Sequence, residues 1–114
     1  MIEKGRLDEA IPHFEQALKS EPNSPQLNSA MGRLLAARGR FAEAIPYMEK
    51  AAGSGEPTLL GMLSAVYAQT GRIEDALRVA RRGLQIASDR HERDLIAEFE
   101  RSIKAYEAAL PKRE

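Results

Sequence analysis

The chain has 114 residues, and 17 Lys and Arg side chains balance 17 Asp and Glu side chains, so its formal net charge is zero. This length suits one domain, and 43% hydrophobic residues are enough to form a core. The charge balance argues against a nucleic-acid or anionic-membrane surface, and the lack of cysteine excludes disulfides, thiolate nucleophiles and cysteine-based zinc sites. No apolar run approaches the roughly 20 residues that span a bilayer, and residues 1–6 lack the apolar stretch of a signal peptide. We therefore expect no membrane insertion and, by default, a cytoplasmic location.

Six helices are predicted in chain order, because apolar residues recur at spacings of three and four and no strand-like alternation occurs. Short segments rich in glycine, proline, serine or asparagine separate them. The predicted helices are Leu7–Ser20, 25–38, Phe41–Ala52, 58–70, Ile73–Leu84, and a final helix over roughly Asp89–Leu110.

Three segments of the chain resemble one another. Gly5-Arg6-Leu7-Asp8-Glu9-Ala10-Ile11-Pro12 aligns with Gly39-Arg40-Phe41-Ala42-Glu43-Ala44-Ile45-Pro46 and with Gly71-Arg72-Ile73-Glu74-Asp75-Ala76-Leu77-Arg78. The three glycines are 34 and then 32 residues apart, which indicates a repeated unit of two helices joined by a glycine turn.

These units resemble the tetratricopeptide repeat (TPR) family, whose first helix carries a Trp-x2-Leu-Gly-x2-Tyr pattern and whose second carries Ala-x3-Phe. The matching positions are Ala10, Phe14, Ala17 and Pro22 in the opening unit, Asn28, Met31, Gly32, Leu35, Ala44, Met48 and Pro57 in the middle unit, and Leu60, Leu63, Ser64, Tyr67, Ala76 and Ala80 in the third. The sequence departs from the family at Asn28, where a large apolar residue is usual. The resemblance implies an all-α fold, a short right-handed α-solenoid. It would form one domain over 1–114, with a half repeat at 5–24, repeats at 25–56 and 57–88, and a capping helix at 89–110.

The opening unit has a second helix but no first helix before it. The apolar face formed by Ile11, Phe14 and Leu18 would therefore lack its usual partner. Either the chain is an accessory fragment of a larger protein, or another copy covers this face and the chain self-associates as a dimer or a longer stack.

Residues suited to catalysis are few, and we expect no enzyme activity, no cofactor and no metal. His13 and His91 are the only histidines, and Leu95 stands where a His-Glu-x-x-His zinc helix needs its second histidine. No glycine-rich phosphate loop is present. The arginines over residues 72–101 are interleaved with as many acids, so we expect a salt-bridged face and no nucleic-acid partner.

The resemblance to TPR proteins points instead to protein binding, because the first helices of successive units line a concave groove that holds peptides. The positions expected to face it are Gln26, Ser29, Arg33, Ala37, Thr58, Gly61, Met62, Ala65 and Gln69. Small residues there leave room for a ligand backbone, and the polar ones can form hydrogen bonds to it. One alternative is that these are ordinary surface positions at which many residues are acceptable. Another is that the C-terminal helix of the chain itself occupies the groove.

Overall fold

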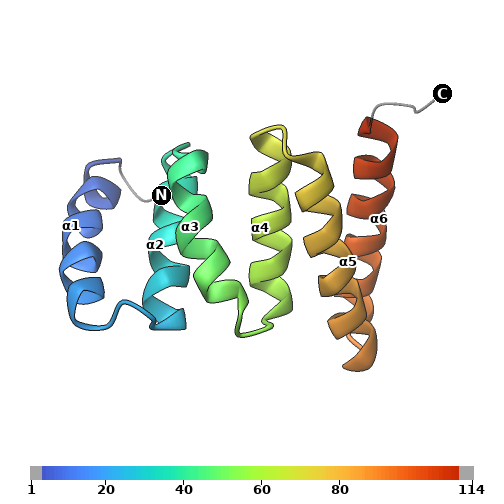
Figure 1. The fold of residues 1–114 in the computed structure, drawn as a ribbon, viewed down its shortest axis with the longest axis horizontal. Helices are drawn as coiled ribbons and strands as arrows, with labels where there is room; N and C mark the ends of the chain where they lie inside the picture. Colours follow the sequence, from blue (N-terminus) through green and yellow to red (C-terminus); the bar gives the residue numbers. More distant parts are fainter. Residues whose placement is uncertain (1–3, 111–114) are drawn as a thin grey trace. The chain divides into compact units, whose positions relative to one another are not determined.

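Most of the observed helices end close to the glycine- or proline-containing segments that separate the predicted ones. The computed structural model describes residues 4–110, in which it contains six helices and no strand. The helices are α1 (Lys4–Ser20), α2 (Pro25–Ala37), α3 (Phe41–Ala52), α4 (Pro57–Gln69), α5 (Ile73–Asp89) and α6 (Arg93–Ala109), coloured from blue to red in Figure 1. Helices α1–α3 form one compact unit, unit 1, which ends at Ser54, and α4–α6 form unit 2, which begins at Gly55.

In unit 1, α2 and α3 form a hairpin and α1 packs against α2 (Figure 1). The hydroxyl of Ser24 accepts a hydrogen bond from the amide of Leu27, so it caps the start of α2, and Pro25 occupies the first turn, where a missing N–H costs least. An ion pair between Asp8 and Arg38, 2.7 Å from Oδ1 to Nε, joins α1 to the end of α2.

The hydrogen bonds of Asn28 explain why this position departs from the family pattern. Its side chain is buried, and its amide nitrogen donates to the carbonyl oxygens of Pro22 and Ser24 at 3.0 and 2.9 Å. A large apolar residue would leave both carbonyls without these donors. Asn28 therefore fastens the α1–α2 connection to α2 where other family members rely on apolar packing.

The small residues of the repeats lie where helices approach closely. Gly32, Ala44, Ser64 and Ala76 are all buried, and Ala10 is half-buried. A Cβ added at Gly32 would come within 2.6 Å of Met48 Cγ, so α2 and α3 meet closely at this position.

In unit 2, α4 and α5 form a hairpin of the same kind, and α6 packs mainly on α5. The ring of Phe99 on α6 is buried in a cluster with Ala80 and Ala87. Leu60, Leu63 and Tyr67 of α4 are almost wholly inaccessible.

Three turns share one geometry, in which the second residue after the helix adopts a positive φ. They are centred on Gly39, Gly71 and His91, with φ of 75°, 81° and 57°. In each, the next amide donates back to a carbonyl five residues earlier, as Glu92 does to Ala87 at 2.9 Å. This is the Schellman arrangement, which favours glycine, so His91 is the unusual member.

Helix boundaries differ from the predictions at both ends of the chain. Helix α1 begins at Lys4 and runs through the Gly5-Arg6 pair, where a turn was expected, because glycine permits a turn without requiring one and costs a helix only about 1 kcal/mol. Helix α5 continues to Asp89, and α6 begins at Arg93.

Candidate peptide-binding site

The predicted groove residues of unit 2 lie on one face of α4. Thr58, Ala65 and Gln69 are exposed, and Gly61 and Met62 are half-buried. The opposite face carries the buried residues Leu59, Leu60, Leu63, Val66 and Tyr67. The apolar face is buried, which leaves the small and polar face available to a ligand.

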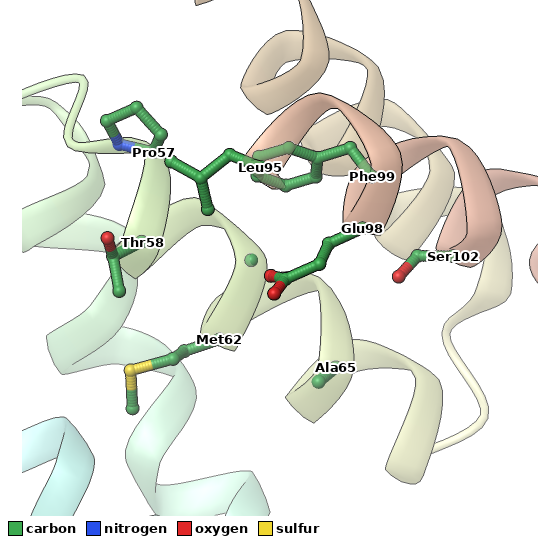
Figure 2. Close-up of a pocket in the computed structure, with 9 residues that line it drawn as sticks. Pro57, Thr58, Met62, Ala65, Leu95, Glu98, Phe99 and Ser102 are labelled. Carbon is green, nitrogen blue, oxygen red and sulfur yellow. The ribbon is translucent and has the colours of Figure 1, made fainter. Parts of the chain in front are cut away.

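Four of these five residues line a surface pocket between α4 and α6 (Figure 2). Its volume is about 310 Å³. The lining residues are Pro57, Thr58, Gly61, Met62 and Ala65 from α4, and Leu95, Glu98, Phe99 and Ser102 from α6. Gln69, one turn beyond Ala65, does not line it.

Two glycines allow Phe99 to form a wall of this pocket. A Cβ added at Gly61 would lie 3.6 Å from Phe99 Cε1, which is ordinary contact, whereas a Cβ added at Gly83 on α5 would lie 2.5 Å from the same atom. The ring therefore occupies space that any other residue at position 83 would fill. The contact fixes α6 against α5 and brings Leu95, Glu98 and Ser102 to the pocket.

Three polar groups lie in a lining that is otherwise apolar. They are the hydroxyls of Thr58 and Ser102 and the carboxylate of Glu98, whose side chain extends from α6 toward α4 in Figure 2. Among the described residues no hydrogen bond or ion pair joins the Glu98 carboxylate to another side chain. A few polar groups converging on apolar walls are typical of a ligand site.

The other predicted groove residues lie on α2 in unit 1. Gln26, Arg33 and Ala37 are exposed, and Ser29 is half-buried. The idea that this surface and the α4 face serve one ligand remains a prediction.

The residues predicted for self-association divide into two groups. Phe14 and Leu18 are half-buried, in keeping with a partly open face on α1. Ile11 is buried, with 7% of its surface exposed. The expectation that Ile11 is uncovered is therefore corrected: with so little of its surface exposed, it cannot offer an apolar contact to a second copy.

Several arginines on the arginine-rich face of unit 2 form ion pairs, as expected. Arg81 reaches Glu107 at 3.3 Å and so links α5 to α6, while Arg90 lies within 4.0 Å of both Glu56 and Glu92. These exposed pairs offset part of the positive charge of this face, which fits the balanced charge of the chain.

The same kind of ion pair stands at the start of α3, between Arg40 and Glu43, and at the start of α5, between Arg72 and Asp75. Burial acts to raise the pKa of Asp75, but hydrogen bonds from Arg72 and Arg78 outweigh it and hold that pKa below its ordinary value. In unit 1 the hydrogen bond from Arg40 lowers the pKa of Glu43, and the same bond raises that of Arg40. Both carboxylates lie in the first turn of a helix, where negative charge is also favoured by the helix dipole.

The sequence indicated the C-terminal helix as a rival occupant of the groove. None of the four α6 residues that line the pocket was assigned to it, namely Leu95, Glu98, Phe99 and Ser102. One signal was present in the sequence: Gly83 interrupts a run of good helix formers, and an isolated helical glycine often marks a close approach.

The described residues, 4–110, also bear on metal binding and on membrane insertion. Within this range, no group of three or more His, Asp or Glu side chains is placed to hold a metal ion. None of the helices in this range combines the length and the apolar character that crossing a bilayer requires.

Several solved structures are similar to this chain in fold. PcrH in complex with the chaperone binding region of PopD is 17% identical, with a TM-score of 0.81 over 92% of this chain and 81% of that one. The Yersinia enterocolitica type III secretion chaperone SycD, in complex with a peptide of the translocator YopD, is also 17% identical, with a TM-score of 0.79 over 92% and 82% of the two chains. TTC0263, a TPR protein of Thermus thermophilus, is 23% identical, with a TM-score of 0.73 over 88% of this chain and 51% of that one. At these identities the likeness concerns the fold alone.

Comparison of sequences agrees with the fold. No curated protein sequence matches the chain. The family model described as tetratricopeptide repeat matches residues 1–52 and 35–98, which together cover most of the chain and all three of the similar segments. The helix hairpins, their glycine turns and their small buried residues fit the same pattern, so the predicted all-α repeat fold is confirmed. The chain belongs to the tetratricopeptide repeat family.

Proposed function

We propose that the chain is a non-catalytic scaffold that binds a peptide segment of another protein on the exposed face of α4. The observation that carries this proposal is the pocket between α4 and α6, which four predicted groove residues line. The TPR fold is a non-enzymatic kind of fold, and it supports a protein–protein interaction scaffold.

The pocket has the size and composition to hold side chains of a peptide. A volume of about 310 Å³ lies at the small end of ligand sites and suits one or two side chains better than a large cofactor. Gly61 and Ala65 have little or no side chain, so a peptide backbone can approach α4 closely there. Thr58 and Ser102 can exchange hydrogen bonds with that backbone.

Two similar structures support the same kind of partner. PcrH was solved with the chaperone binding region of PopD, and SycD with a peptide of the translocator YopD. Binding of a peptide by this chain is proposed by analogy with those complexes, and the α2 residues Gln26, Ser29, Arg33 and Ala37 are proposed as a further contact surface.

The proposal is tested by selecting random 12-residue peptides, displayed on phage, against the whole chain. Peptides that are enriched are then synthesised, and their affinities are measured by fluorescence polarisation for wild type, Ala65→Arg and Ala108→Arg. Ala65 is exposed at the pocket, whereas Ala108 is exposed on α6 and does not line it. We expect Ala65→Arg to weaken binding at least about tenfold, a loss of about 1.4 kcal/mol or more, and Ala108→Arg to leave it unchanged. Equal binding by all three proteins would contradict the proposed site.

A second candidate function is self-association through α1. It is favoured by the half-buried side chains of Phe14 and Leu18, and one similar structure of SycD is described as an alternative dimer. Light scattering on a size-exclusion column would give the mass of wild type and Phe14→Glu, with Gln16→Glu as a control that adds the same charge at an exposed site on α1. If this candidate is right, only Phe14→Glu reduces the mass, and a wild-type monomer at all concentrations would contradict it.

A further inference from the structure

We propose that the α4–α6 pocket selects a peptide segment with a Lys or Arg beside an aliphatic residue, and that Glu98 pairs with the cation. This proposal rests on the proposed function, since it specifies the chemistry of the peptide that the same pocket takes.

The first observation concerns charge. Of the nine residues that line the pocket, Glu98 alone is charged. Some other carboxylates of unit 2 have basic partners: Asp75 pairs with Arg72 and Arg78, and Glu107 pairs with Arg81. Glu98 has no such partner among the described residues, so the pocket presents one uncompensated negative charge to its ligand. Asp94 and Glu100 form no ion pair among the described residues either, so what distinguishes Glu98 is its place in the pocket lining.

The second observation concerns the surface around that charge. Met62 and Leu95 line the same pocket, and Figure 2 shows Glu98 on the α6 side with Met62 across from it on α4. Lys and Arg carry long aliphatic stems that pack on apolar surface while the charged head stays in contact with water or a carboxylate. One basic side chain can therefore satisfy both the apolar wall and the carboxylate, and a neighbouring aliphatic residue can occupy the remaining apolar space toward Phe99.

An acidic or phosphorylated segment fits this pocket poorly. Its negative charge would lie near Glu98, and none of the other eight lining side chains carries a positive charge to offset the repulsion. The negative charge of the pocket therefore favours a positively charged ligand over a negatively charged one.

The test uses the random 12-residue library on phage with wild type, Glu98→Lys and Glu100→Lys. Glu100 is an exposed carboxylate on the same helix that does not line the pocket, so Glu100→Lys makes the same change in net charge elsewhere. We expect wild type and Glu100→Lys to enrich peptides with Lys or Arg next to Leu, Ile, Val or Met. Glu98→Lys should instead enrich peptides with Asp or Glu at the corresponding position.

Affinity gives a second readout. A peptide selected on wild type should bind Glu98→Gln about three- to tenfold more weakly, as expected for a partly desolvated ion pair, and Glu100→Gln less than about twofold more weakly. The difference should shrink as salt is raised from about 50 to about 500 mM, because added salt screens the pair. Thermal melts of all variants check that these exposed substitutions leave the fold intact.

The two proposals fail in different ways. If peptides bind wild type, lose binding to Ala65→Arg and show no preference for basic residues, the assignment of Glu98 is wrong while the proposed function stands. If no peptide binds in a way that depends on Ala65, both are wrong. If Ala65→Arg lowers the mass of the free protein, the pocket takes another copy of this chain, and the basic-peptide proposal is overturned.

Discussion

The α2–α3 hairpin of unit 1 and the α5–α6 hairpin of unit 2 have the same turn and the same close helix contact, but they form them with different residues. Each closes with the same three-residue turn, and each brings its helices together over a buried glycine, Gly32 or Gly83. In the first hairpin the turn residue is glycine and the side chain over Gly32 is the flexible Met48. In the second the turn residue is His91 and the side chain over Gly83 is the rigid ring of Phe99.

This difference shows how a repeat contact can be adapted to make a site. A methionine can adjust its three torsions to fill the space between helices, whereas an aromatic ring keeps its shape. Phe99 lies against Gly83, contacts the Gly61 position and lines the pocket. The α5–α6 hairpin therefore supports the proposed peptide site through a contact that the α2–α3 hairpin makes only for packing.

The largest expected effect follows from removing the ring. Phe99→Ala should lower the free energy of unfolding by about 3–5 kcal/mol, because it removes a buried aromatic side chain and leaves a cavity over Gly83. Urea denaturation followed by circular dichroism measures the loss. Tyr106→Ala, at a half-buried position on the same helix, should cost less. A loss below about 1 kcal/mol for Phe99→Ala would mean that α6 does not depend on this contact.

The two buried glycines should respond differently to an added methyl group. Gly83→Ala should lose about 2–3 kcal/mol, because the new Cβ meets a ring that cannot bend away. Gly32→Ala should lose less, about 1–2 kcal/mol, because the Cγ of the buried Met48 has to shift, while alanine favours the helix by about 1 kcal/mol and offsets part of that cost. Parallel urea titrations compare the two, and equal losses would contradict the contrast between ring and methionine.

Substitutions at two of the turns should change stability in opposite directions. His91→Gly should stabilise the chain by about 0.5–1 kcal/mol, because glycine relieves the positive φ, although its greater freedom in the unfolded chain offsets part of the gain. Gly71→Ala should lower the free energy of unfolding by about 1 kcal/mol, because an alanine is strained at a positive φ. The cost comes from the backbone alone, because no neighbouring atom lies within 4 Å of the added Cβ. Melting temperatures that shift in the same direction would refute this account of the turns.

The smallest expected effect concerns the ion pairs that start α3 and α5. Because the folded-state pKa of Asp75 lies below its ordinary value of about 3.9, its contribution to stability is fully present above that pH and is lost as the pH falls from there through the lower folded-state pKa. Asp75→Asn should cost about 0.5 kcal/mol at pH 7, and the gap to wild type should close below about pH 4. Glu43, whose side chain is 57% exposed against 34% for Asp75, should show a weaker effect in the same direction. A gap that does not depend on pH would show that the charge is not its cause.

Much of this molecule could be predicted from local sequence patterns. The Gly-Arg segments at 39 and 71 indicated the hairpins because a turn and two amphipathic helices are specified within about 34 residues. The same helical spacing identified Thr58, Gly61, Met62 and Ala65, because the face of α4 that is not buried follows directly from the face that is.

The rest depended on contacts between segments far apart in the chain. Glu98 and Ser102 join the pocket only because Phe99 seats α6 over Gly83, and no local pattern states which face of α6 meets α4. Ile11 was assigned to an open face because helical spacing alone does not say which part of an apolar stripe a single neighbouring helix covers.

The most direct test of the central claim is a titration of the uniformly ¹⁵N-labelled chain with a peptide selected from the random library, followed by amide chemical shifts. The proposed site predicts that the largest shifts fall on residues 58–65 of α4 and 95–102 of α6. Shifts that concentrate on α1 and leave both of these segments unchanged would contradict it.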